Sequence, residues 1–327
     1  MTAAVPAPAT AEPYVSLALP LYQPNRIFLA GTVSSIRRQT RPPDEIVFTD
    51  DSEPTVRHWV RNLAEGLPYR FIQNDERLGM VPNWNASVRA TTGTHVVVVH
   101  QDDLLAPEAI SQMLGVFDLR PEIAICGVGQ VQIDEHDRPR RWPVRANHRD
   151  RLFVSPRVHD LDYREMTYLM LRHGQIFGPP TAMMFRREYF DLVGGFDASY
   201  AQSVDIDFAL RMTRAAAAAY LSLPLIRYRY HDSNATVTNV ANGRTLADRD
   251  RLYREHSSSQ DFTREERRRM RANLMIRAAF DGMRATRHGR WGVARTALEQ
   301  MYHYRVAPRV LARRAAEVAL YRNEDAR

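Results

Sequence analysis

Short apolar runs alternate with segments of helical periodicity through the first hundred residues. The apolar runs occupy residues 15–20, 45–49, 69–73 and 96–99. Between them, apolar side chains recur at three- and four-residue spacing, as at Val56, Trp59, Val60 and Leu63. Strands that alternate with helices in this way predict right-handed βαβ units and a mostly parallel, doubly wound α/β sheet.

The second half of the chain is patterned less regularly. Strands are predicted at residues 123–128 and 225–231, and helices at residues 186–192 and 205–216. Residues 134–156 are rich in arginine and proline, show no clear period, and are expected to be irregular. From residue 248 to the end the pattern is helical and rich in arginine.

The ends of the chain differ in composition from its middle. Residues 1–13 are rich in alanine and proline and lack the basic and apolar regions of a signal peptide, so a disordered leader is expected. The sequence therefore divides into a leader at 1–13, an α/β domain at 14–240 and an arginine-rich helical extension at 241–327. No apolar run is long enough to span a bilayer, and a cytoplasmic location is expected.

Composition removes several classes of chemistry. The apolar fraction of 44% and the charged fraction of 25% are typical of a soluble globular protein. Cys126 is the single cysteine, which excludes an intramolecular disulfide and a cysteine zinc cluster. The sequence contains no lysine, which excludes Schiff-base chemistry and a P-loop lysine.

The positive charge is concentrated near the C-terminus. Residues 257–327 contain 16 arginines and 8 acidic residues, whereas the whole chain has a net charge of +7. This segment could be a solvated helical cap, or it could contact an anionic membrane surface if the acceptor is lipid-linked. Its apolar residues could pack on the main domain or on a second subunit, and it carries no recognised nucleic-acid-binding motif.

The candidate chemistry begins where the fourth apolar run ends. Residues 96–99 are followed by His100, Gln101, Asp102 and Asp103. Ligands of open α/β sheets collect at the carboxyl ends of the strands, and adjacent carboxylates repel each other unless a cation or ligand hydroxyls satisfy them. These acids therefore indicate a binding site, and the alternative is an acidic turn that caps a helix.

Six segments, in sequence order, resemble family-2 glycosyltransferases of the GT-A fold. They are the first-strand segment 15–23, the paired aspartates of 45–52, the Asn- and Gly-containing segment 74–93, the acidic motif 100–103, the acceptor-side segment 181–197 and the acidic helix 204–211. The resemblance covers residues 15–231 and implies a GT-A nucleotide-binding domain.

The resemblance implies a divalent metal site. Asp103 would be the direct ligand of Mg²⁺ or Mn²⁺, and Asp102 would contact the ribose hydroxyls or share the metal. His100 replaces the aspartate that many relatives carry at the start of this motif. His231 matches the place where some relatives supply a histidine ligand, and the alternative is a surface histidine at a strand end.

The resemblance also implies contacts with a nucleotide-sugar. Asp51 would pair with the base, Pro20 and Tyr22 would belong to the nucleotide pocket, and Arg77 would reach the diphosphate. The alternative for Asp51 is a turn aspartate before Pro54. The donor would be a UDP-, dTDP- or GDP-linked sugar.

Asp205 is the predicted catalytic base. An acceptor hydroxyl must lose its proton as it attacks the anomeric carbon, and a positioned carboxylate can accept that proton. The alternative is a favourable acid in the first turn of a helix. Asp207 is interpreted as structural, and Val204 stands where a glutamate is usual.

The predicted function is an inverting transfer of a sugar to a saccharide or lipid-linked hydroxyl, in bacterial surface polysaccharide, glycolipid or glycoconjugate synthesis. The alternative is a non-catalytic protein of the same fold that binds a nucleotide-sugar or carbohydrate, because one aspartate and one glutamate of the pattern are replaced. A dinucleotide dehydrogenase is disfavoured because no Gly-x-Gly-x-x-Gly follows the first strand.

Overall fold

The computed structural model describes residues 14–140, 152–153, 157–231, 235–257 and 261–324. The predicted leader at 1–13 and most of the irregular segment after residue 140 lie outside these ranges. The strands of the sheet are β1 (Val15–Leu21), β2 (Glu45–Asp50), β3 (Tyr69–Gln73), β4 (His95–Val98), β5 (Leu104–Leu105), β6 (Ile123–Ile133), β7 (Val158–Leu161), β8 (Met183–Arg186) and β9 (Ala217–Arg229).

These strands form one mixed sheet in the order β3-β2-β1-β4-β8-β6-β9-β5, with β7 paired to β9. The first four in chain order are parallel to one another, as predicted. β8 is antiparallel to β4 and to β6, while β9 is parallel to β6. The carboxyl ends of β1, β2, β4 and β9 therefore lie at the same edge of the sheet.

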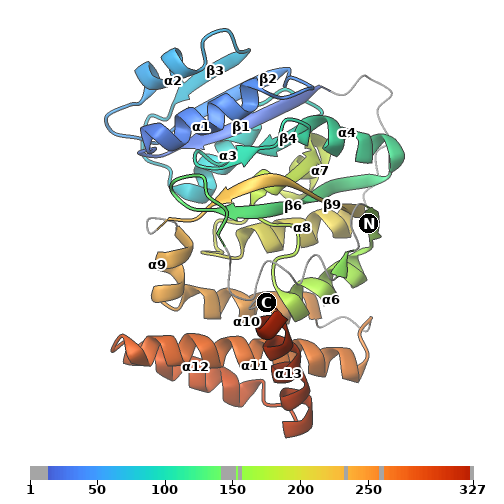
Figure 1. Cartoon of the computed structure of the whole chain (residues 1–327). Coiled ribbons are helices and arrows are strands. Elements are labelled where there is room, and N and C mark those ends of the chain that lie inside the picture. Colours follow the sequence, from blue (N-terminus) through green and yellow to red (C-terminus); the bar gives the residue numbers. More distant parts are fainter. Residues whose placement is uncertain (1–13, 141–151, 154–156, 232–234, 258–260, 325–327) are drawn as a thin grey trace.

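Helices cover both faces of the sheet (Figure 1). On one face α1 (Arg26–Arg37), α2 (Arg57–Leu63) and α4 (Ala109–Leu119) bury their apolar stripes against Leu17 and Leu19 of β1. On the other face lie α3 (Met80–Ala90), α6 (Tyr163–His173), α7 (Arg187–Val193) and α8 (Val204–Ala215), packed against Val96 and Val98 of β4. Burial of these apolar faces stabilises the layers by roughly 25 cal/mol per Å² of apolar surface.

The helices that follow the sheet form an additional layer. They are α9 (Ala235–Ala241), α10 (Arg244–Ser257), α11 (Arg264–Arg287), α12 (Trp291–His303) and α13 (Pro308–Glu324). In Figure 1, α11 and α12 lie farther from the sheet than α6, α8 and α10. Asn273 and Arg277 of α11 donate hydrogen bonds to the carbonyls of Leu171 and His173 at 2.8 and 2.7 Å, which satisfies the open end of α6.

The structure corrects several predicted boundaries. The fifth strand continues from 128 to Ile133, and the late strand begins at Ala217 instead of 225 and ends at Arg229. β7 and α6 were not predicted. The helix predicted at 186–192 is α7, which ends at Gly194 with a φ of 82°, a conformation that favours glycine.

Candidate functional site

The parallel strands place the predicted residues along one edge of the sheet. Leu21 at the end of β1 is in register with Asp50 at the end of β2, and β4 runs beside β1. Tyr22 and Asp51 follow β1 and β2 directly, and Asp102 follows β4 after four residues. Pro20 is buried inside β1, in register with Thr49, so it supports this edge from within the sheet.

Asp51 organises the loop that leads into α3. Its carboxylate is only 5% exposed. Oδ1 accepts hydrogen bonds from Asn74 Nδ2 at 2.9 Å and from the Leu78 N–H at 2.8 Å, and Oδ2 accepts one from the Gly79 N–H at 2.8 Å. Asp51 thereby fixes the loop that carries Arg77 to the rim.

Arg77 and Tyr22 lie together on the surface of this rim. The guanidinium carbon of Arg77 lies 4.3 Å from the centre of the Tyr22 ring, in a cation–π contact. The Tyr22 N–H donates to Gln101 Oε1 at 2.9 Å, and Gln101 Nε2 donates to the Tyr22 carbonyl at 3.1 Å. Gln101 therefore ties an exposed aromatic side chain and its cation to the acidic segment that follows β4.

Asp102 and His231 form a contact between the ends of β4 and β9. His231 Nε2 lies 2.9 Å from Asp102 Oδ2, and both side chains are 17% exposed. The His231 ring also lies against Phe28 of α1, at 5.4 Å between ring centres. Two groups predicted as metal ligands, far apart in the sequence, are thus brought together.

Asp103 lies behind Asp102 and is fully buried. Thr181 Oγ1 donates to its Oδ2 at 2.7 Å, and the Arg229 N–H donates to its Oδ1 at 3.1 Å. Burial, with a further contribution from the Asp102 carboxylate, raises the pKa of Asp103 well above its ordinary value. Of the two acids, Asp102 is therefore the more accessible.

His100 completes a group of possible metal ligands. His100, Asp102 and Asp103 each offer one ligand atom, and these atoms all lie within 4.8 Å of one another. His100 Nε2 is buried and has no hydrogen-bond partner among the described residues. Burial lowers the pKa of His100 against the opposing effect of Asp102, which favours the neutral imidazole that a metal binds. The residue that departs from the family pattern is therefore also a potential ligand.

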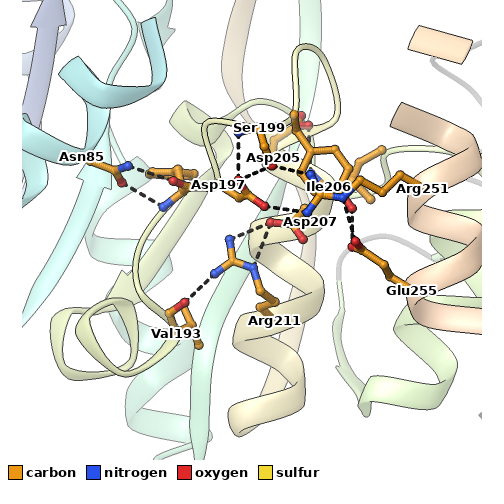
Figure 2. Close-up of polar contacts among 12 residues, drawn as sticks. Asn85, Val193, Asp197, Ser199, Asp205, Ile206, Asp207, Arg211, Arg251 and Glu255 are labelled. Carbon is orange, nitrogen blue, oxygen red and sulfur yellow. Dashed lines mark hydrogen bonds and ion pairs between the residues drawn. The ribbon is translucent and has the colours of Figure 1, made fainter. Parts of the chain in front are cut away.

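Asp205, the residue predicted as catalytic base, lies in the first turn of α8. It is partly buried, and its Oδ1 accepts a hydrogen bond from the Ile206 N–H at 2.9 Å. Figure 2 shows Asp205 and Asp207 at the start of α8, with Arg211 paired to Asp207. Asp207 is 2% exposed and accepts two hydrogen bonds from Arg211, at 2.9 and 2.6 Å, so its contacts are those of a structural group.

A series of aromatic contacts connects the start of α8 to the acidic segment. His100 packs on Trp84 at 4.9 Å between ring centres, Trp84 packs on Phe196 at 5.5 Å, and Phe196 packs on Phe208 of α8 at 4.1 Å. Asn85 holds the Phe196 backbone with two hydrogen bonds of 2.8 Å. Packed aromatic rings therefore connect the helix that carries Asp205 to the group formed by His100, Asp102 and Asp103.

Four supporting residues were not identified from the sequence. They are Gln101, Thr181, Arg229 and Asp248. Asp248 of α10 is 6% exposed, and its Oδ2 accepts the N–H groups of Ala201, Gln202 and Ser203 at 3.1, 2.6 and 2.9 Å. A helix of the predicted C-terminal extension thus holds the loop that leads to Asp205. Gln101 and Thr181 lay in recognised segments, but no sequence signal distinguished Arg229 or Asp248.

Comparisons with known proteins identify the family of the chain. The family model described as Glycosyl transferase family 2 matches residues 16–194. An uncharacterized protein of Mycobacterium tuberculosis, MT1568, is 29% identical over 74% of this chain and 75% of its own length. The uncharacterized glycosyltransferase YwdF of Bacillus subtilis is 26% identical over 71% of this chain and 81% of its own length.

Two solved structures share the fold across nearly the whole chain. TarS of S. aureus in complex with UDP-GlcNAc has a TM-score of 0.65 and 14% identity, and covers 95% of this chain and 90% of that one. The mannosyltransferase PcManGT of Pyrobaculum calidifontis, in complex with GDP-Man and Mn²⁺, has a TM-score of 0.56 and 18% identity, and covers 98% and 85%. Within the described ranges, no helix is both long and apolar enough to cross a membrane.

Proposed function

We propose that this chain, which belongs to glycosyl transferase family 2, transfers a sugar from a nucleoside-diphosphate donor to an acceptor hydroxyl with inversion. The observation that carries the proposal is the shared rim formed by Tyr22, Arg77, Asp102 and His231. This rim combines an aromatic side chain, a cation and metal-ligating groups, which are the chemical types that a nucleotide diphosphate requires.

The donor set fits a hard divalent cation such as Mg²⁺ or Mn²⁺. Asp102, with His231 beside it and the orphaned Nε2 of His100 behind, would hold the ion. Asp103 would position this group through its bonds to Thr181 and Arg229, or supply a further oxygen. The bound cation supplies Lewis-acid stabilisation of the departing diphosphate. The Mn²⁺ of PcManGT supports this choice of ion.

The remaining rim residues fit the nucleotide. Tyr22 offers an exposed ring to a base, and Pro20 supports the strand end from which it projects. Arg77 carries a guanidinium suited to phosphate oxygens, although it must release the Tyr22 ring or bind the phosphate while in contact with it. Asp51 already accepts two hydrogen bonds at Oδ1 and one at Oδ2, so one acceptor position on Oδ2 remains for a base N–H.

Asp205 would accept the proton of the acceptor hydroxyl. The hydroxyl oxygen forms a bond to the anomeric carbon, the bond from that carbon to the diphosphate oxygen breaks, and the proton passes to the Asp205 carboxylate. One displacement from the face opposite the leaving group inverts the configuration at that carbon. The hydrogen bonds of Asp248 to the loop before α8 would keep the carboxylate in place.

UDP-GlcNAc bound by TarS and GDP-Man bound by PcManGT support a UDP- or GDP-sugar as the donor, and a dTDP-sugar belongs to the same proposed class. The acceptor that we propose is a saccharide or a lipid-linked saccharide of bacterial surface polysaccharide, glycolipid or glycoconjugate synthesis.

A screen of UDP-, GDP- and dTDP-sugars with and without Mn²⁺ tests the proposal. One donor class should raise the thermal unfolding temperature more strongly with Mn²⁺, since a ligand of the native state stabilises it by mass action. The same donor should be hydrolysed slowly or transferred. Stabilisation without turnover of any donor would favour the non-catalytic alternative, and neither effect with any donor would contradict both.

A further inference from the structure

One face of α12 presents large apolar side chains to solvent. Trp291, Leu298 and Tyr302 are 69%, 65% and 71% exposed. Together with Arg295 they follow one another at spacings of four, three and four residues, so they form one stripe along the helix. Ala297, on another face of α12, is fully buried in a small core shared with α10 and α11. The helix is thus packed on the protein through that face, and the stripe is left at the surface.

The stripe lies in a strongly basic part of the chain. Residues 282–305 contain five arginines, all of them exposed: Arg284, Arg287, Arg290, Arg295 and Arg305. Glu299 is the single acidic residue of this range, and it pairs with Arg295 at 2.9 Å. Four positive charges therefore remain around the stripe, in the layer of helices that Figure 1 shows farthest from the sheet.

A hollow adjoins the C-terminal half of the stripe. It has a volume of about 870 Å³ and is lined by Arg271, Leu298, Glu299, Tyr302, His303 and Arg305. The guanidinium carbon of Arg305 lies 4.3 Å from the centre of the Tyr302 ring, and Arg271 donates to the His303 and Arg305 carbonyls at 3.4 and 3.1 Å. Cations and apolar side chains are thus fixed next to each other.

We propose that this face of α12 docks on an anionic membrane surface. Trp and Tyr rings favour the depth of the lipid headgroups, where one end of the side chain is apolar and the other is hydrated. Arginine side chains lay their apolar stems along the same surface and extend the guanidinium to the lipid phosphates. A helix with such a stripe lies flat in the interface and does not cross the bilayer.

A lipid surface fits the stripe better than a second copy of this chain. In a two-fold dimer the same patch of both copies meets, so the arginines of one copy would face those of the other. Like charges in such a contact repel, whereas anionic headgroups attract the same arginines. The proposal does not depend on the sugar-transfer reaction, because the stripe shares no residue with the rim of Tyr22, Arg77, Asp102 and His231.

Flotation of the full chain with vesicles tests the proposal. The wild type should bind vesicles of phosphatidylcholine that contain phosphatidylglycerol more tightly than vesicles of phosphatidylcholine alone, and added salt should weaken this binding. The double variants Trp291→Ala/Leu298→Ala and Arg295→Gln/Arg305→Gln should each raise the lipid concentration for half-maximal binding at least about tenfold. All four side chains are exposed, so the unfolding temperatures should stay close to that of the wild type.

Matched control variants remove the same kinds of side chain elsewhere. Leu119→Ala/Leu192→Ala truncates two apolar side chains that are 64% and 51% exposed, and Arg61→Gln/Arg89→Gln removes two exposed arginines from α2 and α3. Both should change vesicle binding by less than about twofold.

Three outcomes would overturn the proposal. The first is failure of the wild type to bind the phosphatidylglycerol vesicles, and the second is equal weakening of binding by the stripe variants and their controls. The third is a dimer, detected by sedimentation velocity, that Trp291→Ala/Leu298→Ala dissociates, because the stripe would then be covered by a second copy.

Discussion

His231 Nε2 lies 2.9 Å from Asp102 Oδ2, although 129 positions separate the two residues in the sequence. The contact exists because β4 and β9 end at the same edge of the sheet, and because β5, which directly follows Asp103, pairs with β9. It joins the acidic motif to a histidine and places both at the proposed metal site.

We predict that His231→Ala weakens the metal dependence of donor turnover. Loss of the imidazole removes the partner of Asp102 and one potential ligand, so the Mn²⁺ concentration for half-maximal rate should rise about ten- to hundredfold. Titration of initial rates with Mn²⁺ measures this. His288→Ala, at the exposed end of α11, should behave as wild type. An unchanged Mn²⁺ requirement in His231→Ala would exclude His231 from the metal site.

Asp205→Asn should remove the proposed catalytic base and leave donor binding nearly unchanged. The amide cannot accept the acceptor's proton, so kcat should fall on the order of 10²–10⁴-fold, with nucleotide affinity nearly unchanged. Rates at saturating donor, together with calorimetric nucleotide binding, measure the two effects.

Asp207→Asn is the informative comparison for Asp205. It removes a buried carboxylate that is bonded to Arg211, so it should lower the free energy of unfolding by about 1–3 kcal/mol. Comparable kcat losses in both variants, with equal destabilisation, would assign Asp205 a structural role.

Sequence periodicity predicted the parallel half of the sheet because each βαβ unit is local. Each of the four apolar runs corresponds to one of the strands β1 to β4, and helical or turn segments separate these strands. The antiparallel pairing of β8 and the length of β9 depend on which strands meet in space, and a single strand's pattern does not encode its partner. α6 did carry a signal, since Asp162 caps it and Met166 and Met170 are spaced by four residues.

Candidate site residues could be predicted only where a reactive side chain comes shortly after a predicted strand. The paired acids after an apolar run indicated a site at Asp102, whereas the resemblance to the family indicated His231. The hydrogen bonds of Thr181 and Arg229 to Asp103 span 78 and 126 positions, and the Arg229 bond uses its backbone N–H, which every residue except proline offers. Such partners are brought together by the fold, and their residue types alone do not identify them.

We predict that Asp248→Asn impairs both stability and the use of the acceptor. The carboxylate accepts three successive N–H groups before α8, and an amide nitrogen in place of Oδ2 would face these donors. The free energy of unfolding should fall by about 1–3 kcal/mol, and kcat should fall while the KM for donor stays near its original value. Denaturant unfolding and steady-state kinetics measure these, with exposed Asp118→Asn as control. Unchanged kcat in a destabilised variant would limit Asp248 to stability.

His95 should make the stability of the fold fall in acid. Its side chain is buried in β4 with its ring 4.7 Å from that of Phe117, and burial, reinforced by the charge of Arg186, lowers its pKa from 6.5 to about 4. Between pH 4 and pH 6.5 the unfolded chain therefore binds a proton at His95 that the folded chain does not. The free energy of unfolding is therefore greatest above pH 6.5 with respect to this group, and it decreases by up to about 3 kcal/mol as the pH falls to about 4.

The variant His95→Gln removes this titration. Because glutamine also changes the packing, the quantity to compare is the slope of unfolding free energy against pH, measured by denaturant unfolding between pH 4 and 7. The slope should be smaller in His95→Gln than in the wild type, while His136→Gln, whose side chain is 65% exposed, should retain the wild-type slope. Equal slopes in His95→Gln and the wild type would show that His95 is protonated alike in both states, because only a difference in bound protons between them produces a dependence on pH.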